Sequence, residues 1–496
     1  MPDDPLAERR PDDAEAAAVA ADERPATFRD VFGVREFRAL YLACSISWLG
    51  DYLARAAITV LVYQQTRSVL LSAASFAVSY LPWIVGGPLL AAVAERYPYR
   101  RVMIVGDLIR MVLITLILIP GLPVAAILVL LFLATLPNPP TQAAKSALVP
   151  LILGRHRLVV GLALTSSTHQ GAQVVGYLGG ATLAAAFSPR AAIAVDAVTF
   201  ALSALLLARG VRARPAAGNP VRRAHLLRET GEGFAVVFGN RLLRRVAVLV
   251  FSLMLFAIVP EGLAAAWAGQ TSPLGGSRGF AQGLIMAATP VGFILGGVVI
   301  GRFVAPARRS ALIRPLAILA PLAMVPALAG PPPVVVALMA LITGFAVSGL
   351  MPVLNGMFVL ALPHGYRARA FGVMQGGMQL TQGAAVMLTG LLAERFSVPS
   401  VVGAWSLGGT VLMIVVAARW PSQNAFDAAI AATGAEADEP PDGGPRDAGP
   451  PGTGARDAAP PDPARADAGR GEAARVTPAA GPDVMSSPPG AGRMER

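Results

Sequence analysis

Long apolar segments separated by short polar stretches dominate the chain from residue 38 to residue 418. About 20 apolar residues in an α-helix cross a bilayer core of about 30 Å, and most of these segments reach that length. The pattern predicts twelve membrane-spanning helices, at about 38–64, 69–94, 102–120, 123–153, 158–187, 191–208, 243–268, 280–302, 310–329, 333–361, 367–394 and 399–418. We therefore expect an all-α membrane protein.

Polar stretches divide this pattern into five parts. The gap after the sixth segment is the longest and carries many arginines, which is typical of a linker between two halves. Both ends of the chain lack apolar periodicity, which favours disorder. The predicted parts are an N-terminal tail (1–35, mostly disordered, with a short interfacial helix at 28–37), a six-helix half (36–209), a linker (210–242), a second six-helix half (243–420) and a disordered tail (421–496).

Arginines gather in alternate loops between the apolar segments. The loops after segments two, four, eight and ten and the linker carry two or more each, whereas the opposite loops carry at most one. Loops rich in Lys and Arg stay in the cytoplasm. The tails and the linker are therefore predicted to be cytoplasmic.

Composition supports a membrane protein and argues against several other classes. Of 496 residues, 54% are hydrophobic and 14% are charged, which is typical of a polytopic membrane protein. The net charge of +11 comes from dispersed arginines rather than the clustered basic face of a nucleic-acid-binding protein. Lys145 is the single lysine, and this bias toward Arg, Ala, Gly and Pro suggests a GC-rich bacterial genome, hence the bacterial inner (plasma) membrane.

Motifs of enzymes and cofactor sites are missing from the sequence. The single Cys44 cannot form an intramolecular disulfide. Lys145 follows an alanine, so the Gly-Lys-Ser/Thr of a phosphate-binding loop is absent, and the four histidines lack the HExxH spacing of a zinc site. We expect neither an enzyme nor a metal or cofactor.

Asp51 lies at the centre of the first apolar segment, with Arg55 one turn later. A charge at that depth costs about 2.5–3.5 kcal/mol or more, so such a residue is a functional candidate. A buried carboxyl group favours its neutral form, so Asp51 is a candidate proton carrier, with Arg55 able to favour the charged form. The alternative is a structural ion pair between the two, which are neighbours at i and i+4.

The two predicted halves resemble each other. Asp51 corresponds to Glu261 in the seventh segment, and Arg100-Arg101 to Arg308-Arg309, at an offset of about 210 residues. Parallel repeats of this kind occur in transporters whose substrate site lies between the halves. Glu261 is therefore a second proton-coupling candidate; the alternative is a residue in a wet outer vestibule.

Residues 34 to about 420 resemble the major facilitator superfamily, and its drug-efflux branch of macrolide and siderophore exporters in particular. The resemblance rests on LGDYLARAAITVLVYQQTRS and on LPWIVGGPLLAAVAERYPYRRVMIVGDLIR, although Ala91 and Pro98 replace usual glycines of the loop after segment two. Gly176 replaces the proline of the family's antiporter signature in segment five. The resemblance implies a twelve-helix fold with two pseudo-symmetric halves, no enzymatic activity, and antiport. We expect a gating network after segment two, formed by Glu95, Arg96, Arg100, Arg101, Asp107 and Arg110.

Other polar residues in the apolar segments are candidates for the cavity lining. They are Asn138, Gln142, Lys145, His169, Gln170, Gln173, Asn355, Gln375, Gln379 and Gln382. The glutamines could instead form hydrogen bonds between helices, and Lys145 could extend to the membrane surface. Asp196 is interpreted as a helix-terminal residue.

Taken together, these features predict a secondary transporter that exports an amphiphilic small molecule, coupled to proton entry, by alternating access. Its partners would be that substrate, protons and the lipid bilayer, with no nucleic acid. Uptake or uncoupled passage is the first alternative. A non-transporting membrane scaffold is the second.

Overall fold

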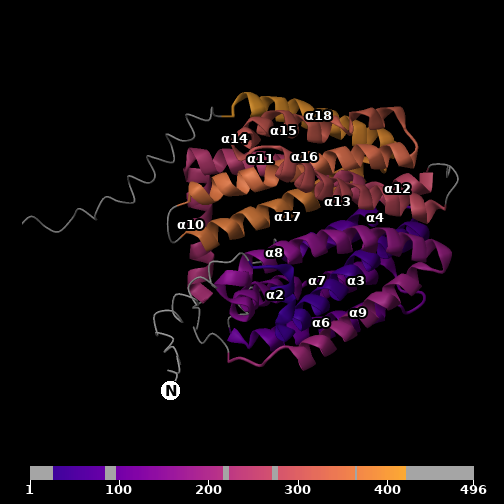
Figure 1. The fold of residues 1–496 in the computed structure, drawn as a ribbon. Coiled ribbons are helices and arrows are strands. Elements are labelled where there is room, and N and C mark those ends of the chain that lie inside the picture. Colours follow the sequence, from indigo (N-terminus) through magenta and orange to yellow (C-terminus); the bar gives the residue numbers. More distant parts are fainter. Residues whose placement is uncertain (1–25, 84–95, 216–222, 271–276, 363–365, 421–496) are drawn as a thin grey trace, which may run out of the picture. The chain divides into compact units, whose positions relative to one another are not determined.

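The structure is a computed structural model that describes residues 26–83, 96–215, 223–270, 277–362 and 366–420. Every regular element in these ranges is a helix (Figure 1). In chain order they are α2 (Phe28–Gly33), α3 (Arg35–Thr66), α4 (Val69–Ala77), η1 (Val78–Tyr80), α6 (Tyr99–Ile117), α7 (Val124–Thr135), α8 (Asn138–Ala186), α9 (Pro189–Gly210), α10 (Arg223–Gly239), α11 (Arg241–Ala257), α12 (Val259–Gln270), α13 (Arg278–Phe303), α14 (Pro306–Arg309), η2 (Ser310–Leu312), α15 (Ile313–Leu322), η3 (Val325–Ala329), α16 (Pro333–Leu360), α17 (Arg367–Leu392) and α18 (Val398–Ala418). Residues 1–25 of the predicted N-terminal tail, the C-terminal tail at 421–496, residues 84–94 of the predicted segment at 69–94, and Glu95 lie outside the described residues.

Within the described ranges, seven segments are long and apolar enough to cross a membrane. They are Val124–Gly154, Pro189–Gly210, Arg241–Gln270, Arg278–Phe303, Ser310–Ala329, Pro333–Leu360 and Val398–Ala418. The expectation of an all-α, multi-pass membrane protein is confirmed, whereas the count of twelve spans stays a prediction. Helix α10 lies where the sequence predicts a polar linker.

Proline and glycine set the breaks inside the long segments. Helix α11 ends at Ala257 and α12 begins at Val259, because Pro260 has no N–H to donate and its ring clashes with the preceding turn. The Trp405 indole donates a hydrogen bond of 3.0 Å to the Leu255 carbonyl near this break. Within α8, Gly154 has a φ of 66°, a left-handed conformation that favours glycine. This residue separates the fourth predicted segment from the fifth.

Small polar side chains begin several helices. Ser68, Ser188, Ser277 and Ser397 each accept a hydrogen bond from a backbone N–H in the first turn that follows, in α4, α9, α13 and α18. Asn240 does the same for α11. These contacts satisfy N–H groups that have no partner inside a helix. Local sequence therefore fixes where these helices start.

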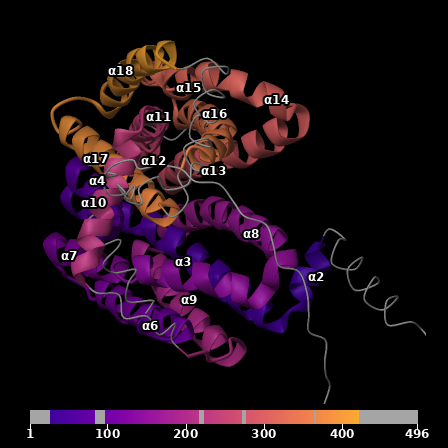
Figure 2. The same cartoon turned by 90° about the vertical axis from the view of Figure 1, so that its left-hand side faces the viewer.

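Helices α8 and α13 lie side by side in both views of the fold (Figures 1 and 2). A Cβ atom on Gly279 of α13 would lie 2.4 Å from the Ala181 carbonyl oxygen of α8, so only glycine permits this approach. Nearby, the Gln282 amide donates hydrogen bonds to the Ala56 carbonyl at 3.0 Å and to the Thr59 hydroxyl at 3.1 Å. These contacts join residues before the predicted linker to residues after it.

A second contact of this kind joins α17 to α4. Glu394, two residues after the end of α17, accepts hydrogen bonds from the Ser68 hydroxyl at 2.6 Å and from the Leu70 N–H at 2.8 Å. These two donors lie at the start of α4. Together they lower the pKa of the Glu394 carboxyl group below its ordinary value, with the Ser68 bond as the larger cause.

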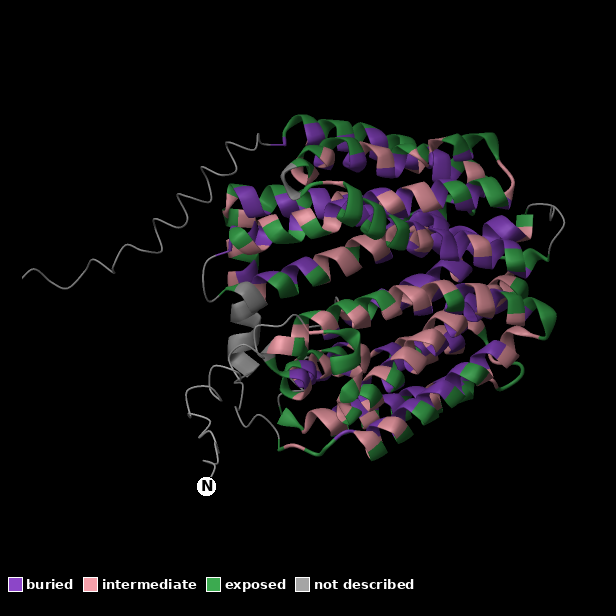
Figure 3. Cartoon of the chain, in the orientation of Figure 1, coloured by how far each residue is buried: buried purple, intermediate pink, exposed green. Residues whose placement is uncertain are grey.

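Large apolar side chains are exposed along the outer helix faces, while the buried residues face neighbouring helices (Figure 3). Val129, Val198, Leu338 and Val411, for example, are each more than half exposed. Soluble proteins rarely expose apolar surface so widely. These faces suit contact with lipid.

Candidate functional site

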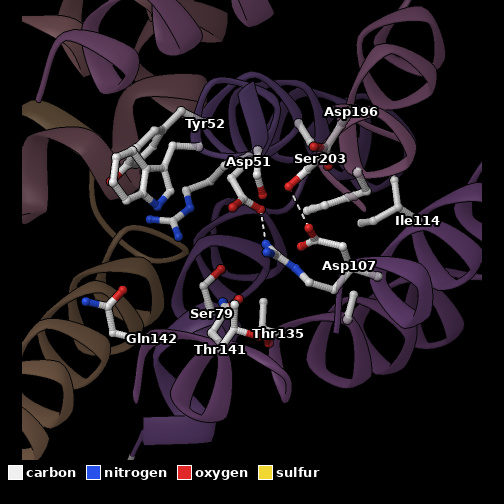
Figure 4. A pocket seen from close by; sticks show the side chains of 18 of the residues that line it. Asp51, Tyr52, Ser79, Asp107, Ile114, Thr135, Thr141, Gln142, Asp196 and Ser203 are labelled. Atoms are coloured by element: carbon white, nitrogen blue, oxygen red, sulfur yellow. Dashed lines mark hydrogen bonds and ion pairs between the residues drawn. The ribbon is translucent and has the colours of Figure 1, made fainter. Parts of the chain in front are cut away.

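A cavity of about 200 Å³ lies among α3, α4, η1, α6, α7, α8 and α9. Its lining residues run from Cys44 to Ser203, so all of them precede the predicted linker. Figure 4 shows Asp51, Asp107, Asp196 and Ser203 gathered around it. The internal repeat predicts a substrate site between the two halves, whereas this cavity is lined by residues of the first.

The Arg110 guanidinium of α6 donates a hydrogen bond to the Asp51 carboxylate of α3, and the two groups form an ion pair (Figure 4). The Arg110 side chain is 7% exposed and the Asp51 side chain 28%. The guanidinium carbon of Arg110 also lies 4.2 Å from the ring centroid of Phe200 in α9. Both side chains line the cavity, and Asp51 is the more exposed of the two.

Arg55 is not the partner of Asp51, so the predicted pair between these two is corrected. The Arg55 guanidinium instead lies over three aromatic rings, 5.6 Å from Tyr52, 5.3 Å from Phe76 and 5.9 Å from Tyr80. Two residues at i and i+4 share a helix face, but a side chain from a neighbouring helix can compete for either of them. Here α6 supplies that competitor.

Asp107 and Asp196 also line the cavity, and each has a hydroxyl partner. The Ser203 hydroxyl donates to Asp107 at 2.6 Å, and the Thr199 hydroxyl lies 3.2 Å from Asp196 Oδ1. The interpretation of Asp196 as a helix-terminal residue is wrong, because it lies about two turns inside α9 with 1% of its surface exposed.

The approach of α9 to α3 at this point depends on Gly50. A Cβ atom there would lie 2.0 Å from Thr199 Oγ1 and 2.4 Å from Asp196 Oδ1. Such distances are far below van der Waals contact, so a larger residue would push the two helices apart. The sequence gives no sign of this approach.

Glu261 lies in α12 and is 4% exposed. The hydroxyl group of Tyr177, from α8, donates a hydrogen bond of 3.3 Å to its carboxylate. The alternative of a wet outer vestibule therefore does not describe this state, because Glu261 is buried between helices from the two sides of the predicted linker. The break before α12 begins the helix that carries it.

Lys145, Asn138 and Gln142 line the cavity from α8. Their spacing places them on one helix face. The Lys145 ammonium lies 4.3 Å from the Trp48 ring centroid, so this side chain points into the cavity rather than to the membrane surface. His169 also lines the cavity, with its Nε2 3.0 Å from the Tyr52 hydroxyl.

The remaining cavity candidates lie away from this lining. Gln170 and Gln173 of α8 and Gln379 of α17 are half-buried, while Asn355 of α16 and Gln375 of α17 are exposed. Gln382 contacts the Met254 sulfur at 3.6 Å. Sequence reasoning missed Gln282, although a single amide in an apolar segment is a visible signal.

Residues of the predicted gating network occupy different places. Arg96 and Arg101 are exposed, and Arg100 donates to the Leu207 and Ala208 carbonyls near the end of α9. Asp107 and Arg110 belong to the cavity instead. A gating role for these residues stays a prediction.

The described residues hold no group of three or more His, Cys, Asp or Glu side chains arranged to bind a metal ion. The acidic and basic groups of the cavity are paired with each other, with hydroxyl groups or with rings. This arrangement can bind a polar ligand and exchange protons at its carboxylates.

Comparison with known proteins identifies the family. The model of the Major Facilitator Superfamily matches residues 40–324. Macrolide efflux protein A of Streptococcus pyogenes is 23% identical over 231 residues, which cover 45% of this chain and 56% of that protein, so the chain spans about half the length of this relative.

Solved transporters share the fold at low sequence identity. A peptide transporter POT in complex with alafosfalin has a TM-score of 0.61 at 17% identity, covering 81% of this chain and 98% of that one. The nucleoside transporter NupG has a TM-score of 0.59 at 17% identity, covering 79% and 99%. The chain belongs to the Major Facilitator Superfamily, and it is a membrane transporter rather than an enzyme.

Proposed function

We propose that this transporter exports amphiphilic small molecules in exchange for protons. The observation that carries the proposal is the Asp51–Arg110 pair, which places a carboxylate on the wall of a membrane-embedded cavity. Ionisable residues in such positions mark proton and substrate pathways. The partial similarity to a macrolide efflux protein favours export.

The proposed architecture has twelve spans in two pseudo-symmetric halves, at 36–209 and 243–420. Loop arginines support cytoplasmic tails and a cytoplasmic linker, in the inner membrane of a bacterium. In this orientation, α3 runs outward from the cytoplasm, so Thr59 and Thr66 lie near its outer end. The contacts of Gln282 and Glu394 with the first half then lie on the outer side. We interpret the structure as a state closed toward the outside.

In the proposed cycle, protonation of Asp51 removes its charge and releases Arg110. A neutral carboxylic acid no longer holds a guanidinium by an ion pair, so the cavity gains an unpaired cation. Arg110 can then turn toward Asp107, which also lines the cavity. The net charge of the cavity therefore depends on whether Asp51 is protonated.

Glu261 is the proposed second proton-coupling residue. Its hydrogen bond with Tyr177 crosses from the second half to the first. A protonated and an ionised carboxyl group differ in how they accept this bond, so the state of Glu261 affects the contact between the halves. Arg55 lies over the rings of Tyr52 and Tyr80, and Tyr52 packs against Tyr177. A change in the charge of Glu261 would therefore act on Arg55 electrostatically.

The test uses purified protein in liposomes with an imposed pH gradient. The probes are erythromycin, ethidium and naphthalene-1-acetate, with a pH-sensitive dye inside the vesicles. We expect accumulation of at least one probe that requires the gradient and that dissipates it. Accumulation without proton movement would indicate another energy source, and equilibration without accumulation would indicate an uncoupled facilitator. Either result would refute proton-coupled export.

Orientation is part of the same experiment. Proteoliposomes are sorted by protease accessibility of the linker, so that transport out of the cytoplasmic face is measured separately from the reverse. Transport in the opposite direction under a physiological gradient would favour uptake instead. A matched control replaces Asp51 and Arg110 together, by Asn and Gln, which removes the titratable group without leaving a buried unpaired charge.

A further inference from the structure

Lys145 carries a charge for which the structure shows no counter-ion. Its ammonium lies 4.3 Å from the Trp48 ring centroid, on the cavity side of α8. Among the described residues, no carboxylate lies within ion-pair distance of it. A ring face attracts a cation but does not neutralise it. The positive charge of Lys145 is therefore not compensated by a carboxylate of the described residues.

The three carboxylates of the cavity already have partners. Asp51 pairs with Arg110, while Asp107 and Asp196 have hydroxyl partners in Ser203 and Thr199. All three carboxylates come from α3, α6 and α9, whereas Lys145 comes from α8. An incoming cation would have to displace an internal partner. An incoming anion finds a cation that is available.

The wall around Lys145 is aromatic. The His169 ring meets the Trp48 ring edge-on, with 4.8 Å between centroids, and it is held by the Tyr52 hydroxyl at 3.0 Å. Trp83 and Phe200 also line the cavity. Edge-to-face contacts with such rings favour a flat aromatic group. The positive charge of Lys145 and the surrounding rings together favour an anionic ligand that contains an aromatic ring.

Size limits this ligand further. The cavity of about 200 Å³ is smaller than the roughly 300–1,000 Å³ typical of pockets for drug-sized molecules. Asn138 and Gln142 extend along the same face of α8 as Lys145 and offer hydrogen bonds to ring substituents. A molecule with one or two fused rings fits these constraints better than a large amphiphile.

We propose that this cavity binds a small aromatic carboxylate, with the carboxylate against Lys145 and the ring among Trp48, Tyr52 and His169. The inference rests on the proposed export function, because it names amphiphilic weak acids as the substrate class of that transport. It concerns binding alone, so it can be tested without a gradient.

The test compares three probes that share one ring system: naphthalene-1-acetate, its neutral amide, and the cation 1-naphthylmethylamine. Equilibrium dialysis with purified protein in detergent gives the affinity of each. We expect the carboxylate to bind about 10- to 100-fold more tightly than the amide, as for hydrogen bonds to charged groups. Equal binding of acid and amide, or preference for the amine, would overturn the proposal.

Variants of Lys145 locate the effect. Lys145→Gln should abolish the preference for the acid over the amide, and Lys145→Arg should retain most of it. Arg157→Gln is the matched control, because Arg157 is an exposed cation of α8 that does not line the cavity. An unchanged preference in Lys145→Gln would show that the anion binds elsewhere. If that variant does not fold, the three probes on the unaltered protein still decide.

Failure of this inference and failure of the proposed function have different signatures. If the protein shows no preference for the acid but still transports erythromycin or ethidium with the gradient, the proposed substrate class is refuted and proton-coupled export is retained. Selective binding of the acid without any coupled transport would remove the export mechanism and leave the site.

Discussion

Replacing Asp51 with asparagine tests which residue is its partner. Asparagine keeps the shape of the side chain but cannot pair ionically with Arg110, which is 7% exposed. Removing one member of a buried pair costs about 3–5 kcal/mol, because the other charge is left without a partner. The substitution should therefore reduce the free energy of unfolding.

The structure places the cost at the lower end of that range. Asp51 is 28% exposed toward the cavity, so water partly replaces it. Arg110 also keeps its contact with the Phe200 ring, which is worth about 0.5–2 kcal/mol. We expect Asp51→Asn to lose about 3 kcal/mol, and the double variant with Arg110→Gln to recover most of this loss. Arg55→Gln should recover none of it, because Arg55 lies over aromatic rings instead.

The assay is reversible unfolding of purified protein in mixed micelles, completed as a double-mutant cycle. Coupling between positions 51 and 110 should exceed about 1.5 kcal/mol, whereas coupling between 51 and 55 should stay below about 0.5 kcal/mol. The reverse pattern would refute the assignment of Arg110 as the partner. Wild-type stability in Asp51→Asn would show that the pair contributes nothing to folding, which leaves Asp51 free to act in proton transfer alone.

Three further predictions follow from the packing and the outer contacts. Glu394 has a lowered pKa in the folded state, so its contact stabilises the protein above its unfolded pKa of about 4.3 and is lost as pH falls through the lower folded value. The stability difference between wild type and Glu394→Gln, under about 1 kcal/mol for this exposed group, should therefore shrink as pH falls below about 4.3. Gly50→Ala should cost about 1–3 kcal/mol by unfolding in mixed micelles, whereas Gly179→Ala, where a Cβ meets nothing within 4 Å, should be neutral; equal effects would contradict the close approach. In a Cys44→Ala background, a cysteine at position 224 should react with an impermeant maleimide from the cytoplasm, and a cysteine at position 330 should react from outside. Reaction of both cysteines from the same side would overturn the proposed topology.

Helix positions were predictable because they depend on local features. Apolar length identified the segments, and α3 covers the predicted first one. The break before α8 follows from the prolines around Asn138, and the break before α12 follows from Pro260. Each of these signals acts within a turn or two of where it is read.

Partners across helices were not predictable, because they depend on packing that the sequence does not encode locally. Asp51 has Arg55 within one turn, yet its partner is 59 residues away on α6. Asp196 gave no sign of lining a cavity, because its position depends on the approach of α9 to α3 at Gly50. The cavity around Asp51 is lined by the first half alone, while a substrate site between the halves stays a prediction.

The cavity also brings together two rare side chains. Cys44 is the single thiol of the sequence and Lys145 the single side-chain amine, and both line this cavity, from α3 and α8. A short reagent with a maleimide at one end and an active ester at the other would therefore join these two helices at one defined place. The unaltered chain thus offers a cross-link whose rate would report changes in the width of the cavity during transport, with no residue introduced.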